Sequence, residues 1–203
     1  MVRKMIFIAL FSMALLLGTA CDDDNGPQPG VPDNSFAIGT TNYPTTNAYL
    51  LLDDGPNYLD QYGILLADTD FREDNVNGIS MNTNGKHAVV LWVNNSSTLF
   101  TNEQDVMISI GTHVLDEEST AIYDIIQFED TYPLGTDTYG EPSENGASVV
   151  EAGSSGGGNV TINSVTVDYT ARTAQLDISY TLTNGVVSLN GQFIGNAGLL
   201  NGF

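Results

Sequence analysis

The feature that most constrains this chain is a recurrence of short apolar runs, often alternating with polar residues, between Gly, Asn, Asp and Pro. Such runs are typical of β-strands and the turns that join them. An amphipathic helix would instead repeat apolar residues about every 3.6 positions, and no segment of useful length does so. The pattern therefore predicts an all-β fold of about ten short strands, without an internal repeat of fixed period.

Residues 36–203 are long enough to form a single domain with its own hydrophobic core. Short strands joined by tight turns favour an antiparallel β-sandwich of about 8–10 strands. A closed calycin-like β-barrel is the alternative, because the sequence does not report whether the sheet closes on itself.

Two segments carry the clearest strand patterns. In Lys86–Val93 both alternating faces are apolar, which predicts a central strand covered on both sides. Residues 160–193 alternate between turn signals and predict a three-stranded antiparallel meander. Its first strand should contain a β-bulge, because Ile162 and Val165 fall on opposite parities.

Turn residues predict how other strands connect. Asn84-Gly85 and Asn184-Gly185 each indicate a hairpin with a type I′ turn. The polar, acidic stretch 71–78 is expected to be a loop. Residues 131–158 are expected to be loop-rich, apart from one strand at 147–151.

The first 20 residues have the order of a secretory signal. The basic segment Val2–Lys4 precedes a thirteen-residue apolar run, Met5–Leu17, and the small residues Gly18–Ala20 lead to Cys21. As a helix this run would be about 20 Å long, which is too short for a hydrocarbon core of about 30 Å. Residues 1–20 are therefore predicted to be a cleaved signal peptide and not a membrane-spanning helix.

The stretch Leu17–Cys21 resembles the lipobox of bacterial lipoproteins, although Gly18 stands where a bulky aliphatic residue is usual. The resemblance implies that the Cys21 thiol receives diacylglycerol, and that Cys21 becomes an acylated N-terminus that anchors the protein in a membrane. Asp22, Asp23 and Asp24 resemble the acidic export signal of Bacteroidota-type surface lipoproteins. This implies an outer-membrane anchor and exposure at the cell surface; a domain that faces the periplasm is the alternative.

Residues 21–35 are expected to be the lipidated N-terminus and a flexible tether, since 25–35 contain three prolines and two glycines. Without residues 1–20 the chain carries 25 acidic and three basic side chains, a net charge of −22. A phosphate backbone requires clustered Lys and Arg, so nucleic acid is excluded as a partner. The negative charge favours a soluble monomer.

Local motifs for catalysis are lacking. Cys21 is the only cysteine, no G-x-S-x-G stretch is present, and His87 and His113 both lie in strand-like runs. Two histidines without a cysteine pair also fall short of a zinc site. These observations favour a protein that is not an enzyme over one that is, and they predict no cofactor, with calcium as the one metal to consider.

A calcium site would need clustered oxygen ligands. The best stretch contains the carboxylates of Asp68, Asp70, Glu73 and Asp74, followed by Asn75 and Asn77, and it lacks the residue order of an EF-hand loop.

Four tyrosines lie among Asn, Asp, Gly, Pro and Thr, where their rings could stack on a sugar while amides and acids bind its hydroxyl groups. They are Tyr43, Tyr58, Tyr132 and Tyr139. The predicted location, the all-β fold class and the absence of catalytic motifs favour a non-enzymatic binding module on the cell envelope, for a glycan, a peptide or a partner protein, with these tyrosines as candidate contacts. A carboxylate-based hydrolase of an extracellular polymer and a structural envelope component without a small ligand are the alternatives.

Overall fold

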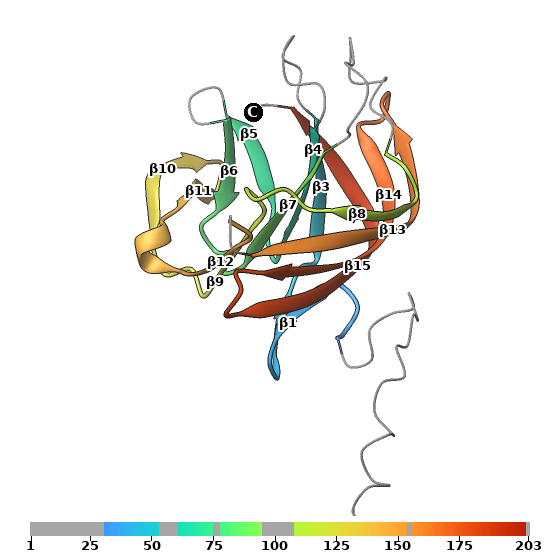
Figure 1. Ribbon diagram of the computed structural model, residues 1–203. Helices are drawn as coiled ribbons and strands as arrows, with labels where there is room; N and C mark the ends of the chain where they lie inside the picture. Colours follow the sequence, from blue (N-terminus) through green and yellow to red (C-terminus); the bar gives the residue numbers. More distant parts are fainter. Residues whose placement is uncertain (1–30, 53–60, 75–77, 95–107, 154–155, 202–203) are drawn as a thin grey trace, which may run out of the picture.

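The computed structural model describes residues 31–52, 61–74, 78–94, 108–153 and 156–201, and its strands form two sheets (Figure 1). The path of sheet A runs through nine strands in the order β12 (Ser148–Glu151), β9 (Thr120–Tyr123), β7 (Ala88–Asn94), β4 (Gln61–Ala67), β3 (Asn47–Leu52), β15 (Ser188–Asn201), β14 (Thr173–Thr183), β13 (Gly157–Asp168) and β8 (Gly111–Val114). An N-terminal hairpin of β1 (Ser35–Ile38) and β2 (Thr41–Pro44) joins sheet A because β1 pairs with β15.

Sheet B has four strands, in the order β10 (Phe128–Leu134), β11 (Asp137–Pro142), β6 (Gly78–Asn82) and β5 (Phe71–Asp74). The described residues contain no α-helix, and one short 3₁₀ turn spans Glu144–Gly146. Among the strands that the structure describes, all pairs are antiparallel except β15 with β3.

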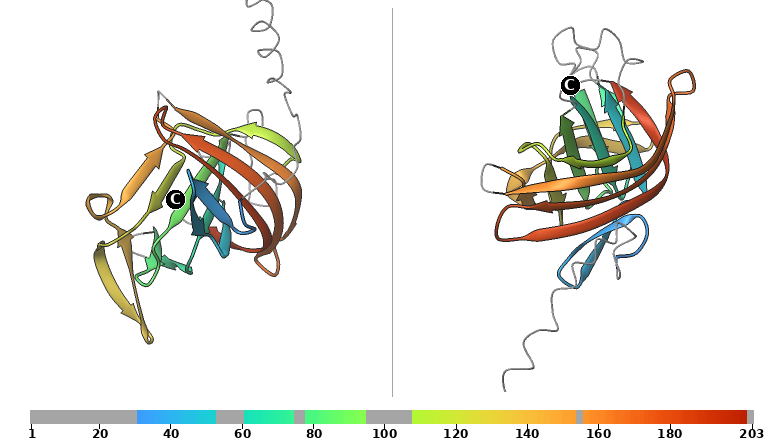
Figure 2. Two further views of the ribbon diagram at one scale, coloured as in Figure 1. Left: turned by 90° about the horizontal axis from the view of Figure 1, so that it is seen from below. Right: turned by 45° about the vertical axis from the view of Figure 1, so that its right-hand side comes forward.

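The strands are arranged in layers. The long strands β13, β14 and β15 curl around one side of the molecule and face the shorter strands β3, β4 and β7 (Figure 2). The larger hydrophobic core lies inside this curl, and a second core lies where sheet B packs against the other face of sheet A. The predicted all-β sandwich is therefore confirmed.

Strand β7 lies between the two cores, as its pattern predicted. Val89, Leu91 and Val93 are buried in the larger core, whereas Ala88 is buried in the second core, with Trp92 partly buried against it. Burying a side chain such as Leu91 contributes about 1.5–3 kcal/mol. A strand with two apolar faces is stable only when both faces are covered, and sheet B is the cover for one of them.

The predicted C-terminal meander is also confirmed. β13, β14 and β15 pair in sequence, and the register shifts between Ile162 and Ser164, where the bulge was expected. The prediction of a type I′ turn at Asn184-Gly185 is wrong, however. The loop between β14 and β15 has four residues, and the Asn184 Oδ1 atom accepts the N–H groups of Val186 and Val187. This side chain fixes a wider loop than the two-residue turn that Asn-Gly usually forms.

The other Asn-Gly pair does not form a hairpin. β6 belongs to sheet B and β7 to sheet A, so the chain crosses between sheets at Asn84-Gly85. A Cβ atom at Gly85 would overlap the Met81 and Thr69 side chains, so this glycine permits a close approach rather than a type I′ turn.

Two further predictions, both of loops, are wrong because the segments form strands of sheet B. Residues 71–78, predicted to be a loop, contribute β5 and the start of β6, because Phe71 packs into the second core while Arg72 points to the surface. The stretch 131–158 contains most of the β10–β11 hairpin besides the strand expected at its end, β12. β10 is an edge strand of sheet B and most of its residues are exposed, so its polar composition reflects an edge position and not irregular backbone.

The end of the predicted tether is attached to the domain. The Gln192 Nε2 atom in β15 donates to the Val31 carbonyl and to Asp33 Oδ1, both at 2.9 Å. The Ile194 N–H donates to Asn34 Oδ1 at 2.8 Å, and the Ser35 hydroxyl donates to the Pro32 carbonyl at 2.6 Å. We call residues 31–34, held in this way on β15, the N-terminal strap.

Candidate functional site

A row of polar and aromatic side chains crosses sheet B. Tyr132 in β10 lies opposite Tyr139 in β11, and Tyr139 lies opposite Asn82 in β6. The Asn82 N–H in turn donates to the carbonyl of Asp70, which directly precedes β5, at 3.1 Å. Residues opposite one another on neighbouring strands present their side chains on the same face. We call these four residues, together with Arg72 two positions after Asp70, the sheet B row.

Asp70 is the centre of a hydrogen-bond network in this row. Its Oδ2 atom accepts the Tyr139 hydroxyl at 2.8 Å and lies 3.1 Å from the Arg72 guanidinium. Its Oδ1 atom accepts a longer bond of 3.4 Å from the Asn82 amide. The pKa of Arg72 is raised, first by its hydrogen bond with Tyr139 and also by the negative charge of Asp70.

Burial divides the row into a base and a surface. Tyr139 is only 2% exposed and Asn82 is also buried, so these two side chains form the base. The side chains of Arg72 and Asp70 are 56% and 32% exposed, respectively. Tyr132 is half-buried and stacks on Tyr139, with ring centroids 6.2 Å apart and an interplanar angle of 26°. The carboxylate and the guanidinium therefore reach the surface on one side of the buried Tyr139 side chain, and the ring of Tyr132 covers Tyr139 from β10.

A β-bulge positions Tyr132 in this row. The register of β10 against β11 shifts between Glu129 and Tyr132, and Asp130 inside the shift has a φ of 44°. An extra residue changes the parity of the strand and therefore the face on which the following side chains lie. The strands approach closely here, since a Cβ at Gly140 would lie 2.7 Å from the Glu129 carbonyl oxygen.

Sheet A supports the row from behind through Tyr49 in β3. The Tyr49 hydroxyl accepts the Phe71 N–H at 3.1 Å, and the two rings lie edge to face with centroids 6.1 Å apart. Burial raises the pKa of Tyr49, although its hydrogen bond from Phe71 acts in the opposite direction. This contact fixes the start of β5, and with it Asp70 and Arg72, against the larger sheet.

Tyr43 lies in a different place, in an aromatic cluster with Phe36, His87 and Tyr123. Its ring stacks on Phe36 at 4.9 Å and meets the edge of His87 at the same distance, with Tyr123 at 5.0 Å. The rings pack against one another, so Tyr43, in β2 of the N-terminal hairpin, packs against the larger core. It is not part of the sheet B row.

His87 directly precedes β7 and is hydrogen-bonded at one nitrogen. The Asp124 N–H donates to His87 Nδ1 at 3.4 Å, so the ring proton is assigned to Nε2, which lies 3.9 Å from Asp68 Oδ2. Burial lowers the pKa of His87, while the negative charges of Asp68 and Asp124 raise it and Lys86 lowers it further. The arrangement holds a neutral imidazole in the cluster.

The proposed calcium ligands have different partners. The Asp68 carboxylate accepts the N–H groups of Lys86 and His87, whereas Asp70 bonds within the sheet B row. Glu73 lies 3.7 Å from Arg172. Within the described ranges, no group of three or more His, Cys, Asp or Glu side chains is placed to hold a metal ion. The side chain of Asp74 is not among those that the structure describes. The calcium site therefore stays a prediction.

Cys21, Asp22–Asp24, Tyr58, Asn75 and Asn77 lie outside the described residues. His113 is in β8, where its Nε2 atom lies 2.8 Å from the Ser109 carbonyl and therefore carries the proton. It borders an open, mostly polar hollow of about 560 Å³ that Asn94 and Asp116 also line.

Sequence reasoning found three members of the sheet B row but not their association. Tyr132 and Tyr139 were candidates for stacking on a sugar, and Asp70 was a candidate for calcium. It missed Arg72 and Asn82. Arg72 could have been found as one of only three basic residues after the signal, two positions from an acid in a strand-like alternation.

Comparisons of the chain with protein-family models, curated proteins and solved structures found no match. Within the described part of the chain, no helix is both long enough and apolar enough to cross a membrane.

Proposed function

We propose that the chain is a lipid-anchored protein of the outer membrane, exposed at the cell surface, whose β-sandwich binds a glycan at the sheet B row. The observation that carries the binding proposal is that Tyr132 stacks on the buried ring of Tyr139, whose hydroxyl donates to Asp70 beside Arg72. Aromatic rings beside a few oriented polar groups are the usual composition of a small-ligand site.

The chemistry of these groups suits a sugar. A pyranose has an apolar C–H face that packs on a ring such as Tyr132, and hydroxyl groups around its rim. Asp70 offers an acceptor and Arg72 offers donors to such hydroxyls. Because Tyr139 and Asn82 are buried and already hydrogen-bonded to Asp70, little side-chain ordering would remain to be done on binding.

The binding proposal is tested with a glycan array followed by calorimetry on the purified lipoprotein. Tyr132→Ala should weaken the best glycan about tenfold, corresponding to about 1.4 kcal/mol for the lost ring contact. Tyr132→Phe keeps the ring and should bind within about twofold of the wild type. If no glycan binds, or if Tyr132→Ala binds as well as Tyr132→Phe, the sheet B row is not a glycan site.

The anchoring proposal rests on residues 17–24 and has its own test. Mass spectrometry of the native protein should find diacylglycerol and acyl chains on an N-terminal Cys21, and Cys21→Ala should leave the membrane fraction. Replacing Asp22, Asp23 and Asp24 with Ala should reduce protease access on intact cells. An unmodified thiol would refute the anchor, and unchanged protease access would refute the export signal.

A further inference from the structure

The charges around the sheet B row restrict which glycan it can take. After the signal, the chain has 25 acidic side chains and three basic ones, Arg72, Lys86 and Arg172. Two of these cations are next to carboxylates: Arg72 lies 3.1 Å from Asp70, and Arg172 lies 3.7 Å from Glu73. Binding a polyanion requires cationic groups that exceed the local negative charge. The Asp70–Arg72 pair at the surface of the row instead has a net charge of zero.

The pair also offers one acceptor and one set of donors side by side. Asp70 Oδ1 accepts only the long bond from Asn82 among the described contacts, and Arg72 is more than half exposed. A guanidinium has five N–H donors, and Asp70 and Tyr139 account for part of them. A carboxylate has acceptors alone, so a uronic acid that reached Arg72 would also meet the negative charge of Asp70.

We propose that the sheet B row recognises an uncharged glycan through a vicinal diol, and that it discriminates against uronic acids. One hydroxyl of the diol donates to Asp70 and its neighbour accepts from Arg72, while a sugar ring of the same glycan lies on Tyr132. The two hydroxyls can do this because each is both a donor and an acceptor, which matches the mixed pair. This inference rests on the proposed glycan site and names its ligand class.

The test compares neutral and acidic polymers of related sugars. The purified lipoprotein is titrated with galactan and polygalacturonate, and with a glucan and a polyglucuronate, at about 20 mM and about 500 mM NaCl. A neutral polymer should bind with an affinity that salt changes by less than about twofold. Each uronate should bind at least about tenfold more weakly than its neutral counterpart at low salt, and the difference should shrink at high salt.

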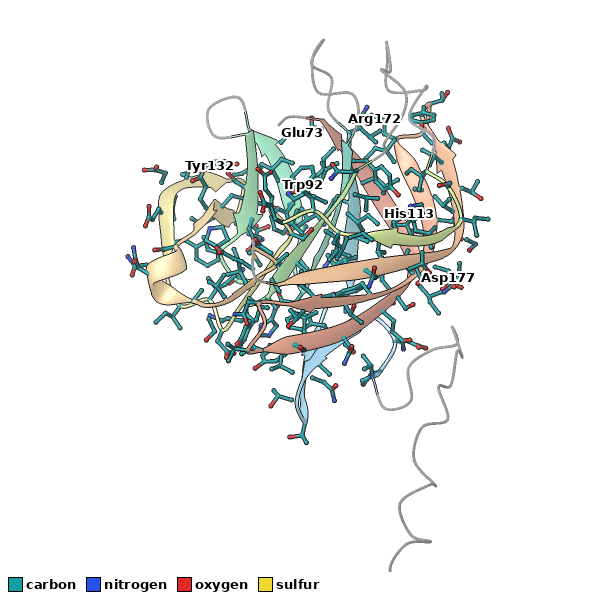
Figure 3. All side chains as sticks on the ribbon, viewed as in Figure 1. Glu73, Trp92, His113, Tyr132, Arg172 and Asp177 are labelled. Atoms are coloured by element: carbon teal, nitrogen blue, oxygen red, sulfur yellow. The ribbon has the colours of Figure 1, made fainter. Side chains whose placement is uncertain are left out.

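The variant Asp70→Asn gives a second, directional test. It replaces the carboxylate with an amide of similar shape, which leaves the charge of Arg72 unopposed. Neutral binding should fall by about tenfold, and uronate binding should become measurable and salt-sensitive. Asp177→Asn removes the same charge from β14, on the far side of the molecule from Tyr132 in Figure 3, and should change neither.

The possible results distinguish a failure of the vicinal-diol inference from a failure of the proposed glycan function. A wild-type preference for uronates over neutral polymers, or an Asp70→Asn variant with unchanged preference, would overturn the diol inference but leave a glycan site. Absence of binding to every polymer, or binding to peptides alone, would overturn the glycan function itself. If Asp70→Asn does not fold by circular dichroism, Arg72→Gln replaces it: neutral binding should fall several-fold, and uronate binding should not rise.

Discussion

The N-terminal strap offers a quantitative test of the structure, through the variant Gln192→Ala. Gln192 is 4% exposed, and its side-chain amide donates two hydrogen bonds of 2.9 Å, to the Val31 carbonyl and the Asp33 carboxylate. A neutral hydrogen bond contributes about 0.5–1.5 kcal/mol and one to a charged group about 1.5–3 kcal/mol. Asp33 is exposed and is readily rehydrated, so we expect a total loss of about 1–3 kcal/mol.

The matched control is Gln175→Ala in the neighbouring strand. Gln175 is exposed and bonds to Asn196, which is also exposed, so its loss should cost less than about 0.5 kcal/mol. Both variants are measured by urea unfolding, where the midpoint should fall for Gln192→Ala at an unchanged slope. Amide exchange supplies a local signal, because the Ile194 N–H donates to Asn34 and should lose protection when the strap detaches. Equal stabilities of the two variants, together with a protected Ile194, would refute the strap.

Two further predictions concern the larger core. A Cβ at Gly191 would overlap the buried ring of Tyr180, so Gly191→Ala should destabilise by about 1–3 kcal/mol in urea unfolding; Gly195→Ala, whose Cβ would meet Phe193 at 3.3 Å, should cost clearly less. The pKa of His87 is lowered by burial, so its contribution to stability is complete above about pH 6.5 and is lost as the pH falls below that value toward the folded pKa. Wild type should therefore lose more stability than His87→Gln between about pH 7.5 and pH 5, and parallel pH profiles would contradict this assignment.

The strands that could be predicted from the sequence are those in which the pattern of apolar and polar residues matches the pattern of buried and exposed side chains. β7 is apolar on both faces because it lies between two cores, and β14 alternates because only one of its faces is buried. Sheet B gave no such signal. β5 has four residues with one buried aromatic, Phe71, and β10 is mostly exposed, so polar composition dominated both.

The Asn-Gly pairs show how tertiary structure overrides a local signal. The dipeptide favours a two-residue turn, but a hairpin also requires that the flanking strands belong together. β6 pairs with β5 and β11, since Met81 faces the second core, and the chain at Gly85 must cross to the other sheet. The sequence of residues 79–93 gives no signal that the chain changes sheets at this point.

The association of the sheet B row could not be predicted, because it depends on distant pairing. Asp70 and Tyr139 are 69 residues apart, and a bulge of one residue decides that Tyr132 faces the same way as Tyr139. A register shift that moves every later side chain to the other face leaves little trace in composition. The two separate hypotheses, calcium at Asp70 and stacking at the tyrosines, therefore pointed to parts of one cluster.

The position of the row explains how an exposed ion pair could have a defined geometry. A surface pair such as Arg72 with Asp70 is usually worth less than about 1 kcal/mol, since both side chains must be ordered to form it. Here the buried Tyr139 hydroxyl and the Asn82 amide hold Asp70, and Tyr49 fixes the adjoining backbone from sheet A. The ordering cost is met by the folding of sheet B on the second core, so the stability of that core determines how well the row is positioned for a ligand.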